Sequence, residues 1–215
     1  IINQNNNIIN QNNPEPLVSV IMNSYNGEKY LHEAINSVFN QSYKNWEIIF
    51  WDNASTDKTA KIATSFGPRI KYFKSEKNIA LGYARNLAFK KASGDFIALL
   101  DDDDIWLPTK LEEQLPLFDD HSVGLVYSDT INFNERKQEK RHFEIFDPVT
   151  GHCFSELLLG IDTFPITTAA VIFRTEVLKN RLINCDLDLI PIRDADLYCR
   201  IAYNWKLDCI NKPLA

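Results

Sequence analysis

The chain has 215 residues, 45% hydrophobic and 24% charged, which is the composition of an ordinary globular protein with one good-sized domain. Its formal net charge of −6 argues against a general affinity for nucleic acid. No run of about 18 apolar residues predicts a transmembrane helix, and no signal peptide is visible. The chain begins at Ile1 rather than Met, so we keep open that it is part of a longer, multidomain protein.

Cysteine and histidine usage indicates a reducing compartment, and we expect a cytoplasmic protein. The cysteines Cys153, Cys185, Cys199 and Cys209 show no CxxC spacing. They are typical of small buried thiols rather than of a disulfide set or a zinc site. The four histidines are scattered without an HxxxH pair, so a His/Cys metal centre is not expected.

The first residues differ in composition from the rest. The letters "IINQNN" at 1–6 recur at 8–13, and "PEP" closes the stretch at 14–16. We interpret 1–16 as an Asn-rich linker or N-terminal extension and 17–215 as one domain. A helical extension packed on a neighbour is the alternative.

From Leu17 the chain alternates between continuous apolar runs and helical patterns. The alternation predicts strands over 17–23, 46–52, 70–75 and 95–101, and helices over 27–41, 55–66, 80–92 and 108–118. Ser55 is the expected N-cap of the second helix, Pro108 is a favoured first residue of the fourth, and Pro116 should cut that helix short. Four such units in order predict an α/β fold with a parallel sheet and right-handed crossovers.

The last third is less regular. We expect a strand over 123–129, a charged hairpin within 130–147, a strand over 167–174 and a helix with an acidic first turn over 193–205. The closing "KLDCINKPLA" stops abruptly, which predicts a domain truncated at its C-terminus.

Polar residues follow three of the predicted parallel strands. They occupy 23–27 after the first strand, 52–54 after the second and 101–104 after the fourth. Ligands of open parallel sheets bind outside the carboxyl ends of the strands. We therefore expect a binding site at this edge.

The four aspartates Asp101 to Asp104 form the densest part of that edge. Two carboxylates about 5 Å apart repel by roughly 3 kcal/mol at an effective dielectric of 20. A Mg²⁺ or Mn²⁺ ion bridging carboxylates and a diphosphate would offset that repulsion. The alternative is an acidic loop that caps the helix expected from Pro108, although one carboxylate would be enough for that.

Other residues of the edge have two interpretations each. Asp52 suits a hydrogen bond from a nucleobase N–H, but it also suits a turn. Tyr25 in "SYNG" is either a platform for a base or part of a tight turn. Arg85, with Asn86, is either a cation near a nucleotide or part of a solvated helix face. There is no GxGxxG and no GxxxxGK[ST] motif.

Two acidic residues begin the last predicted helix. Asp194 or Asp196 could act as a general base that deprotonates an acceptor hydroxyl. Pattern alone favours a simpler interpretation, in which the carboxylates suit the positive first turn and pair with Arg193 or Arg200.

The order and spacing of three blocks resemble those of family 2 glycosyltransferases with the GT-A fold. The blocks are "VSVIMNSYNGEKYLHEAINSVFNQSYKNWEIIFWDNASTDKT", "NIALGYARNLAFKKASGDFIALLDDDDIWLPTKLEEQ" and "RDADLYCRIA", and they span nearly all of residues 17–212. The resemblance implies a Rossmann-like, mostly parallel sheet with helices on both faces. It implies metal-dependent, inverting transfer of a sugar, commonly from a UDP-sugar.

The resemblance also implies roles for single residues. Ser24, Tyr25 and Asn26 would lie near the base, Asp52 would contact uracil, and Arg85 would lie in the nucleotide site. Asp101 and Asp103 would hold a Mn²⁺ or Mg²⁺ ion, Asp103 most directly, with Asp102 near the ribose. Asp194 would be the general base. Asp104 is then left without a role from the resemblance, and we interpret it as supporting the turn before Pro108.

Two departures from the family pattern stand out. Asn53 and Ala54 replace the usual second Asp and the Gly of "DDGS". Ala54 lacks the freedom of glycine at positive φ, so this turn is expected to differ slightly. Arg193 replaces the acidic residue before the base, which should favour an ionised Asp194 or alter acceptor binding.

We expect an enzyme of bacterial polysaccharide biosynthesis with a glycan or lipid-linked acceptor. Peripheral association with the inner face of the cytoplasmic membrane would fit such an acceptor. A non-catalytic module that binds a nucleotide-sugar is the alternative. A sugar nucleotidyltransferase is a third candidate, but "NSYNGEKY" is not the Gly-rich, Arg-containing loop that it would need.

Overall fold

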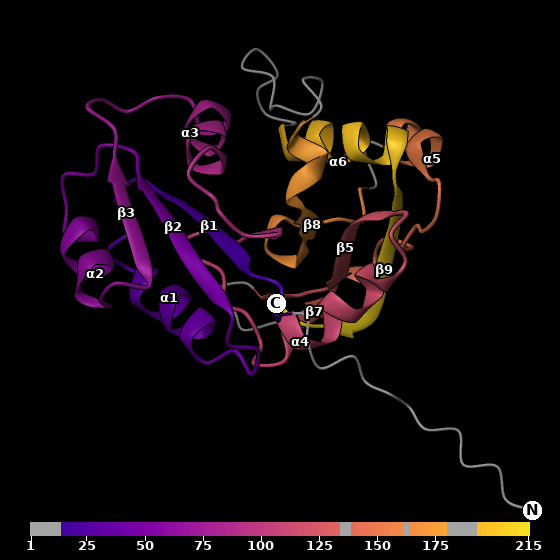
Figure 1. The fold of residues 1–215 in the computed structure, drawn as a ribbon, viewed down its shortest axis with the longest axis horizontal. Coiled ribbons are helices and arrows are strands. Elements are labelled where there is room, and N and C mark those ends of the chain that lie inside the picture. The colour runs from indigo at the N-terminus through magenta and orange to yellow at the C-terminus, as the bar shows by residue number, and fades with distance from the viewer. Residues whose placement is uncertain (1–13, 134–138, 161–163, 180–192) are drawn as a thin grey trace, which may run out of the picture.

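The computed structural model describes residues 14–133, 139–160, 164–179 and 193–215. The described residues form a seven-stranded sheet with helices on both faces and a separate two-stranded hairpin (Figure 1). The Asn-rich stretch 1–13 and Cys185 lie outside the described residues, so the interpretations of both stay predictions.

The first half of the sheet is parallel, as predicted. It contains β1 (Val18–Ser24), α1 (Leu31–Phe39), β2 (Trp46–Asp52), α2 (Thr59–Ser65), β3 (Ile70–Lys74), α3 (Leu81–Phe89) and β4 (Phe96–Leu99). Strand β1 lies between β2 and β4 and pairs in parallel with both. Its seven residues are all buried, which accounts for its continuous apolar sequence.

The second half adds one reversed strand. It contains α4 (Lys110–Gln114), β5 (Val123–Asp129), β6 (Ile131–Phe133), β7 (Glu139–Arg141), α5 (Phe154–Leu159), β8 (Ile172–Arg174), α6 (Arg193–Asn204) and β9 (Lys206–Pro213). The strand order is β3-β2-β1-β4-β8-β5-β9. Strand β8 is antiparallel to β4 and β5, whereas β9 is parallel to β5. The sheet is therefore mostly parallel, as expected.

Two predicted helices begin later than their sequence signals indicated. Helix α2 begins at Thr59, and Ser55 is not its N-cap, because the Ser55 hydroxyl accepts the backbone N–H of Asn26 instead. Helix α4 begins at Lys110 rather than at Pro108. A 3₁₀ turn (Leu115–Asp119) follows it with a proline in its first turn, in agreement with the predicted effect of Pro116.

The strand predicted over 167–174 is shorter than expected. Residues Thr168–Ala170 form a 3₁₀ turn, and only Ile172–Arg174 pair in the sheet as β8. The carbonyl groups of Ala169 and Ala170 accept hydrogen bonds from side chains of Trp106 and Lys110. These carbonyls are therefore not available for strand pairing.

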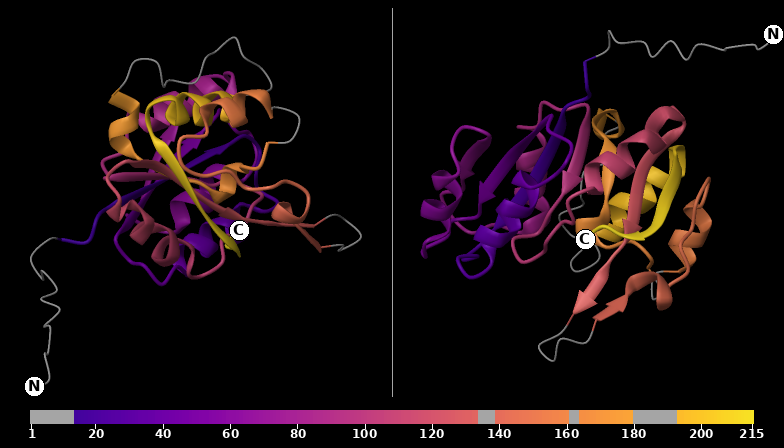
Figure 2. Two further views of the ribbon diagram at one scale, coloured as in Figure 1. Left: turned by 90° about the vertical axis from the view of Figure 1, so that its right-hand side faces the viewer. Right: turned by 90° about the horizontal axis from the view of Figure 1, so that it is seen from below.

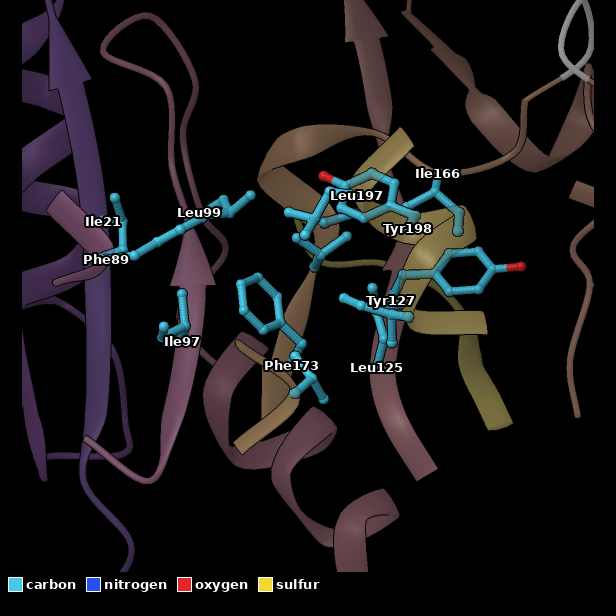
Figure 3. Close-up of a cluster of buried hydrophobic side chains, with 14 of the residues drawn as sticks. Ile21, Phe89, Ile97, Leu99, Leu125, Tyr127, Ile166, Phe173, Leu197 and Tyr198 are labelled. Atoms are coloured by element: carbon cyan, nitrogen blue, oxygen red, sulfur yellow. The ribbon is translucent and has the colours of Figure 1, made fainter. Parts of the chain in front are cut away.

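Two apolar clusters cover the two faces of the sheet. Val20 and Met22 of β1 pack toward α1, α2 and α4, whereas Ile21 faces α3, α5 and α6. Figure 3 shows the second cluster, in which Leu197 and Tyr198 of α6 lie near Leu99 of β4. Alternate residues of each strand thus lie on opposite faces.

The hairpin predicted within 130–147 is present as β6 and β7, which pair antiparallel and project away from the main sheet (Figure 2). Cys153, Cys199 and Cys209 are free thiols, and the first two are buried, as expected. In the described part of the chain, no helix is long and apolar enough to cross a membrane.

Candidate active site

The loops after β1 and β4 touch each other at the carboxyl edge of the sheet. The Ser24 hydroxyl donates a hydrogen bond to the Asp102 carboxylate. A Cβ atom on Gly27 would overlap that same carboxylate, so glycine permits this approach. The backbone N–H of Asp104 bonds to the Asp101 carbonyl at 3.3 Å, which makes the aspartate run a turn. The role predicted for Asp104 in the turn before Pro108 stays a prediction.

Arg85 joins the aspartate run to the predicted base. Its side chain is only 3% exposed and forms ion pairs with Asp194, by contact with Oδ1, and with Asp101, where Nη2 and Oδ1 are 3.3 Å apart. The Thr168 hydroxyl donates to the other oxygen of Asp194 at 2.6 Å. The interpretation of Arg85 as part of a solvated face was therefore wrong, because this side chain is buried between two carboxylates.

The two candidate bases lie in different surroundings on α6. Both oxygens of Asp196 lie 2.8 Å from the Arg200 Nε atom, one turn further along the helix. Asp194, in contrast, pairs with Arg85, which also pairs with Asp101, and we call these ion pairs the Arg85 network. Arg193 begins the helix, but its side chain lies outside the described residues, so its effect on Asp194 stays a prediction.

Burial and the neighbouring carboxylates disfavour full ionisation of the aspartate run. Burial raises the pKa of Asp101 to about 6, with Arg85 lowering it and Asp194 adding to the increase. Burial, followed by the charge of Asp101, raises the pKa of Asp104 to about 6. Burial also raises the pKa of Asp102, although the Ser24 bond opposes it. A cation would therefore be favoured at this loop.

The carboxylate of Asp52 is fully buried, and its bonds belong to the turn after β2. One oxygen accepts the Ser55 backbone N–H at 2.6 Å, and the other accepts the Tyr72 hydroxyl at 2.5 Å. Lys74 lies 3.7 Å from the same carboxylate. These are the contacts expected from the turn interpretation, and the uracil contact implied by the resemblance stays a prediction.

The turn after β2 keeps a left-handed residue at position 54. Ala54 has φ 67° and Asn26, in the facing turn, has φ 56°. The side chain of Asn26 accepts the Thr56 backbone N–H at 2.9 Å, so the two turns are bonded together. Ala54 therefore adopts the conformation that glycine would favour, at a cost of about 1–2 kcal/mol.

A cavity of about 380 Å³ lies between the ends of β1 and β2 and the start of α3. Its lining residues are Asn23, Ser24, Tyr25, Asn53, Asn78, Ile79, Ala80 and Leu81. The Tyr25 side chain is 52% exposed, so its ring is available to a ligand. The cavity is thus a place for a flat group beside an aromatic ring.

A second cavity of about 580 Å³ lies on the other side of the aspartate run. It is lined by Tyr30, Glu33, Asp103, Asp104, Ile105, Ile131 and Asn132. Asp103 is exposed here, whereas Asp101 and Asp102 are bonded to Arg85 and Ser24. Asp103 is therefore the carboxylate of the run that is most accessible to a metal ion.

The residues fit a metal ion that arrives with a diphosphate better than a preformed metal cage. Among the residues that the structure describes, no three His, Cys, Asp or Glu side chains form a group that could hold a metal ion. Magnesium commonly binds nucleotide enzymes through one or two carboxylates, with substrate phosphates and water as further ligands. Exposed Asp103, with Asp101 beside it in the turn, satisfies that smaller requirement.

Sequence reasoning missed one residue of the site and left another without a role of its own. Thr168 bonds to Asp194, but no local signal connects a threonine to an aspartate 26 residues away. Asn23 lines the cavity and was expected at this edge among the polar residues 23–27, but no role was predicted for it.

Residues 19–182 match the family model described as glycosyl transferase family 2. The chain is 43% identical over 112 residues to the Escherichia coli protein WfgD, a UDP-Glc:alpha-D-GlcNAc-diphosphoundecaprenol beta-1,3-glucosyltransferase. That match covers 52% of this chain and 44% of WfgD. The chain spans less than half the length of several curated relatives that it matches.

Solved structures share the fold. The structure of TarS residues 1–349 from S. aureus has a TM-score of 0.71 at 23% identity, over 92% of this chain and 59% of that one. TarS has also been solved with UDP and with UDP-GlcNAc. The mannosyltransferase PcManGT from Pyrobaculum calidifontis, in complex with GDP-Man and Mn²⁺, has a TM-score of 0.66 at 19% identity, over 93% and 55% of the two chains. The expected GT-A fold is confirmed, and the chain belongs to glycosyl transferase family 2.

Proposed function

We propose that the chain is an inverting glycosyltransferase that moves a sugar from a nucleotide-sugar to an acceptor hydroxyl. The observation that carries the proposal is the Arg85 network. It brings Asp194 of α6 to the aspartate run after β4, next to a cavity suited to a base. A general base and a diphosphate-binding loop are the two parts that such a displacement needs.

Asp194 would remove the proton from the acceptor hydroxyl while that oxygen attacks the anomeric carbon. Two of its hydrogen-bonding positions are occupied by Arg85 and Thr168. A carboxylate has about four lone-pair positions, so the acceptor hydroxyl can still donate to Asp194. Arg85 and Thr168 would hold the carboxylate in one orientation, which favours proton transfer along a defined direction.

The bond to the sugar would break with departure of a nucleoside diphosphate. Asp103, with Asp101, would hold a Mn²⁺ or Mg²⁺ ion, which would stabilise the negative charge on that leaving group. Arg85 adds a positive charge beside Asp101, so the cationic side of the site would lie on the α3 side of the loop. The mannosyltransferase PcManGT, which was solved with Mn²⁺, supports a divalent ion.

For the donor we propose a UDP-sugar, supported by the UDP complexes of TarS and by the UDP-Glc-dependent glucosyltransferase activity of WfgD. For the acceptor we propose a glycan or a lipid-linked saccharide, because WfgD acts on a diphosphoundecaprenol-linked sugar. A lipid-linked acceptor would place the reaction at the inner face of the cytoplasmic membrane.

Release of UDP or GDP from UDP-glucose, UDP-GlcNAc and GDP-mannose in the presence of Mn²⁺ tests the proposal, with EDTA as the metal control. We expect slow hydrolysis of the true donor without any acceptor. Asp194→Asn should lower the rate by about 10²-fold or more, as loss of a general base does. Asp196→Asn is the matched control, because Asp196 lies on the same helix but pairs with Arg200.

The alternative is a module that binds a nucleotide-sugar without transferring it. Nucleotide binding by thermal shift, without sugar release in any donor, would favour that alternative. Full activity of Asp194→Asn would instead remove Asp194 from its role while leaving the transferase in place. If no nucleotide or sugar nucleotide raised the melting temperature, both functions would be wrong.

A further inference from the structure

Two side chains hold the Asp194 carboxylate, one on each oxygen. Arg85 contacts Oδ1 and also pairs with Asp101. The Thr168 hydroxyl donates to Oδ2 at 2.6 Å. Asp194 lies in the first turn of α6, whereas Thr168 begins the 3₁₀ turn before β8, and Arg85 lies on α3. The direction in which this carboxylate points therefore depends on what fixes the elements that carry its two partners.

The turn Thr168–Ala170 is fixed by the segment that follows the aspartate run. The indole N–H of Trp106 donates to the Ala169 carbonyl at 2.9 Å. Lys110 and Gln114 of α4 both donate to the carbonyl of the next residue, at 3.0 and 2.8 Å. None of these three side chains is more than 2% exposed, so water does not compete for the bonds. Two successive carbonyls of the turn are thus held from one segment.

Trp106 is anchored through its backbone as well as through its ring. Its N–H donates to the Ser37 hydroxyl of α1 at 3.1 Å. The N–H of the next residue, Leu107, donates to the Leu214 carbonyl at 2.8 Å. Only one residue separates Trp106 from Asp104, the last of the aspartate run. The run is therefore followed almost at once by a fixed residue that bonds to the turn.

Resting on the proposed function, we propose that Trp106 and Lys110 are positioning residues for the general base, acting through the turn Thr168–Ala170. Asp194 is tied to the start of the aspartate run through Arg85, and to the segment after the run through this turn. The loop that would hold the diphosphate and the carboxylate that would take the proton are thereby kept in a fixed relation. A displacement of about 1 Å between reacting groups can cost about 10²-fold in rate, so loosening the turn should be measurable.

The test compares Trp106→Phe, Thr168→Val and the double variant. The readout is release of nucleoside diphosphate, with Mn²⁺, from whichever of UDP-glucose, UDP-GlcNAc and GDP-mannose the unaltered chain hydrolyses. Phenylalanine keeps an aromatic ring without the N–H, and valine keeps the branched shape without the hydroxyl. Each single variant should lower kcat about tenfold, with the calorimetric affinity for the released nucleotide unchanged. Because both changes break one connection, the double variant should also lose about tenfold rather than about a hundredfold.

Two control variants separate positioning of the base from stability of the fold. Thr168→Ser keeps the hydroxyl and should retain most of the turnover. Trp51→Phe removes a similar indole bond, to the Ser75 hydroxyl at 2.8 Å, in another part of the sheet. It should lower the melting temperature about as much as Trp106→Phe does, but leave kcat unchanged. If Trp106→Phe does not fold, Lys110→Met removes the neighbouring bond to the same turn and provides the same comparison.

Three results would overturn the role of Trp106 and Lys110. They are a kcat within about twofold of the unaltered chain, an equal loss of kcat in Trp51→Phe, and losses that multiply in the double variant. Failure of the unaltered chain to release nucleotide from any of the three sugar nucleotides would instead overturn the proposed function itself.

Discussion

Lys110 makes the stability of this chain depend on pH in a way that can be measured. Its side chain is fully buried, and the Nζ atom contacts Gln114, donates to the Ala170 carbonyl at 3.0 Å and lies 4.9 Å from the Trp106 ring centre. Within the described residues, no carboxylate pairs with it. Burial therefore lowers the pKa of Lys110 well below its usual value of 10.5.

The sign and size of the effect follow from proton linkage. The unfolded chain binds a proton at Lys110 that the folded chain binds less readily, so lowering the pH favours unfolding. Between the folded pKa and 10.5, the free energy of unfolding should rise with pH by up to about 1.4 kcal/mol per unit. From pH 7 to pH 9 the gain is at most about 2.7 kcal/mol. With an m-value of about 3 kcal/mol per M, that gain would raise the urea concentration at the midpoint of unfolding by roughly 1 M.

The assay is urea unfolding of the chain and of Lys110→Met at pH 7, 8 and 9, with a reductant present. Methionine keeps a similar length and cannot titrate, so all other titrating groups cancel in the difference between the two proteins. We expect the unaltered chain to gain stability relative to Lys110→Met as the pH rises. A difference that stayed constant from pH 7 to pH 9 would refute the reasoning, because Lys110 would then be equally protonated in both states.

Three further substitutions have clear expected outcomes. Ala54→Gly should raise the free energy of unfolding by up to about 1 kcal/mol, because φ at this position is 67°; a loss of stability in urea would contradict this. Gly27→Ala should push Asp102 away from Ser24 and weaken UDP binding about tenfold by calorimetry, whereas unchanged affinity would show that the loop adapts. Although burial opposes it, hydrogen bonds from three side chains hold the pKa of Glu47 below its usual value. The contribution of the ionised Glu47 carboxylate to the free energy of unfolding is therefore complete above about pH 4.5 and is lost as the pH falls through the folded pKa. Glu47→Gln should thus lower the free energy of unfolding by about 1–2 kcal/mol at pH 7 and by less in acid.

Most of the parallel half of the fold was predictable because every residue of β1, β2 and β4 is buried. β2 was predicted at its observed bounds, since seven consecutive residues are buried between β1 and β3. β8 was predicted too long, because its first residues are held by Trp106 and Lys110, which are distant in sequence. Local patterns indicate which residues are apolar, but they do not indicate which carbonyl a distant side chain will bond.

Some residues of the candidate site were likewise predictable from the sequence, and others were not. The aspartate run was visible in the sequence as a dense group of like charges. The burial of Arg85 was not visible, because its local pattern is equally typical of an exposed helix face, and the partners Asp101 and Asp194 come from other elements. Asp52 and Asn53 are adjacent at the end of β2, but their side chains have different surroundings. Asp52 bonds to Tyr72, whereas Asn53 lines the cavity of about 380 Å³.

The shared position of Arg85 determines which substitution can test the base. Arg85 is buried between Asp101 and Asp194, so removing either carboxylate side chain entirely would leave its charge underpaired, and such a change commonly costs 3–5 kcal/mol. Asp194→Ala would thus combine lost chemistry with a displaced Arg85. Asp194→Asn keeps an oxygen acceptor for Arg85 and a similar shape, while its amide cannot accept the proton of the acceptor hydroxyl. If the Asn variant keeps its melting temperature and its affinity for UDP but loses turnover, the loss reports proton transfer rather than a disordered site.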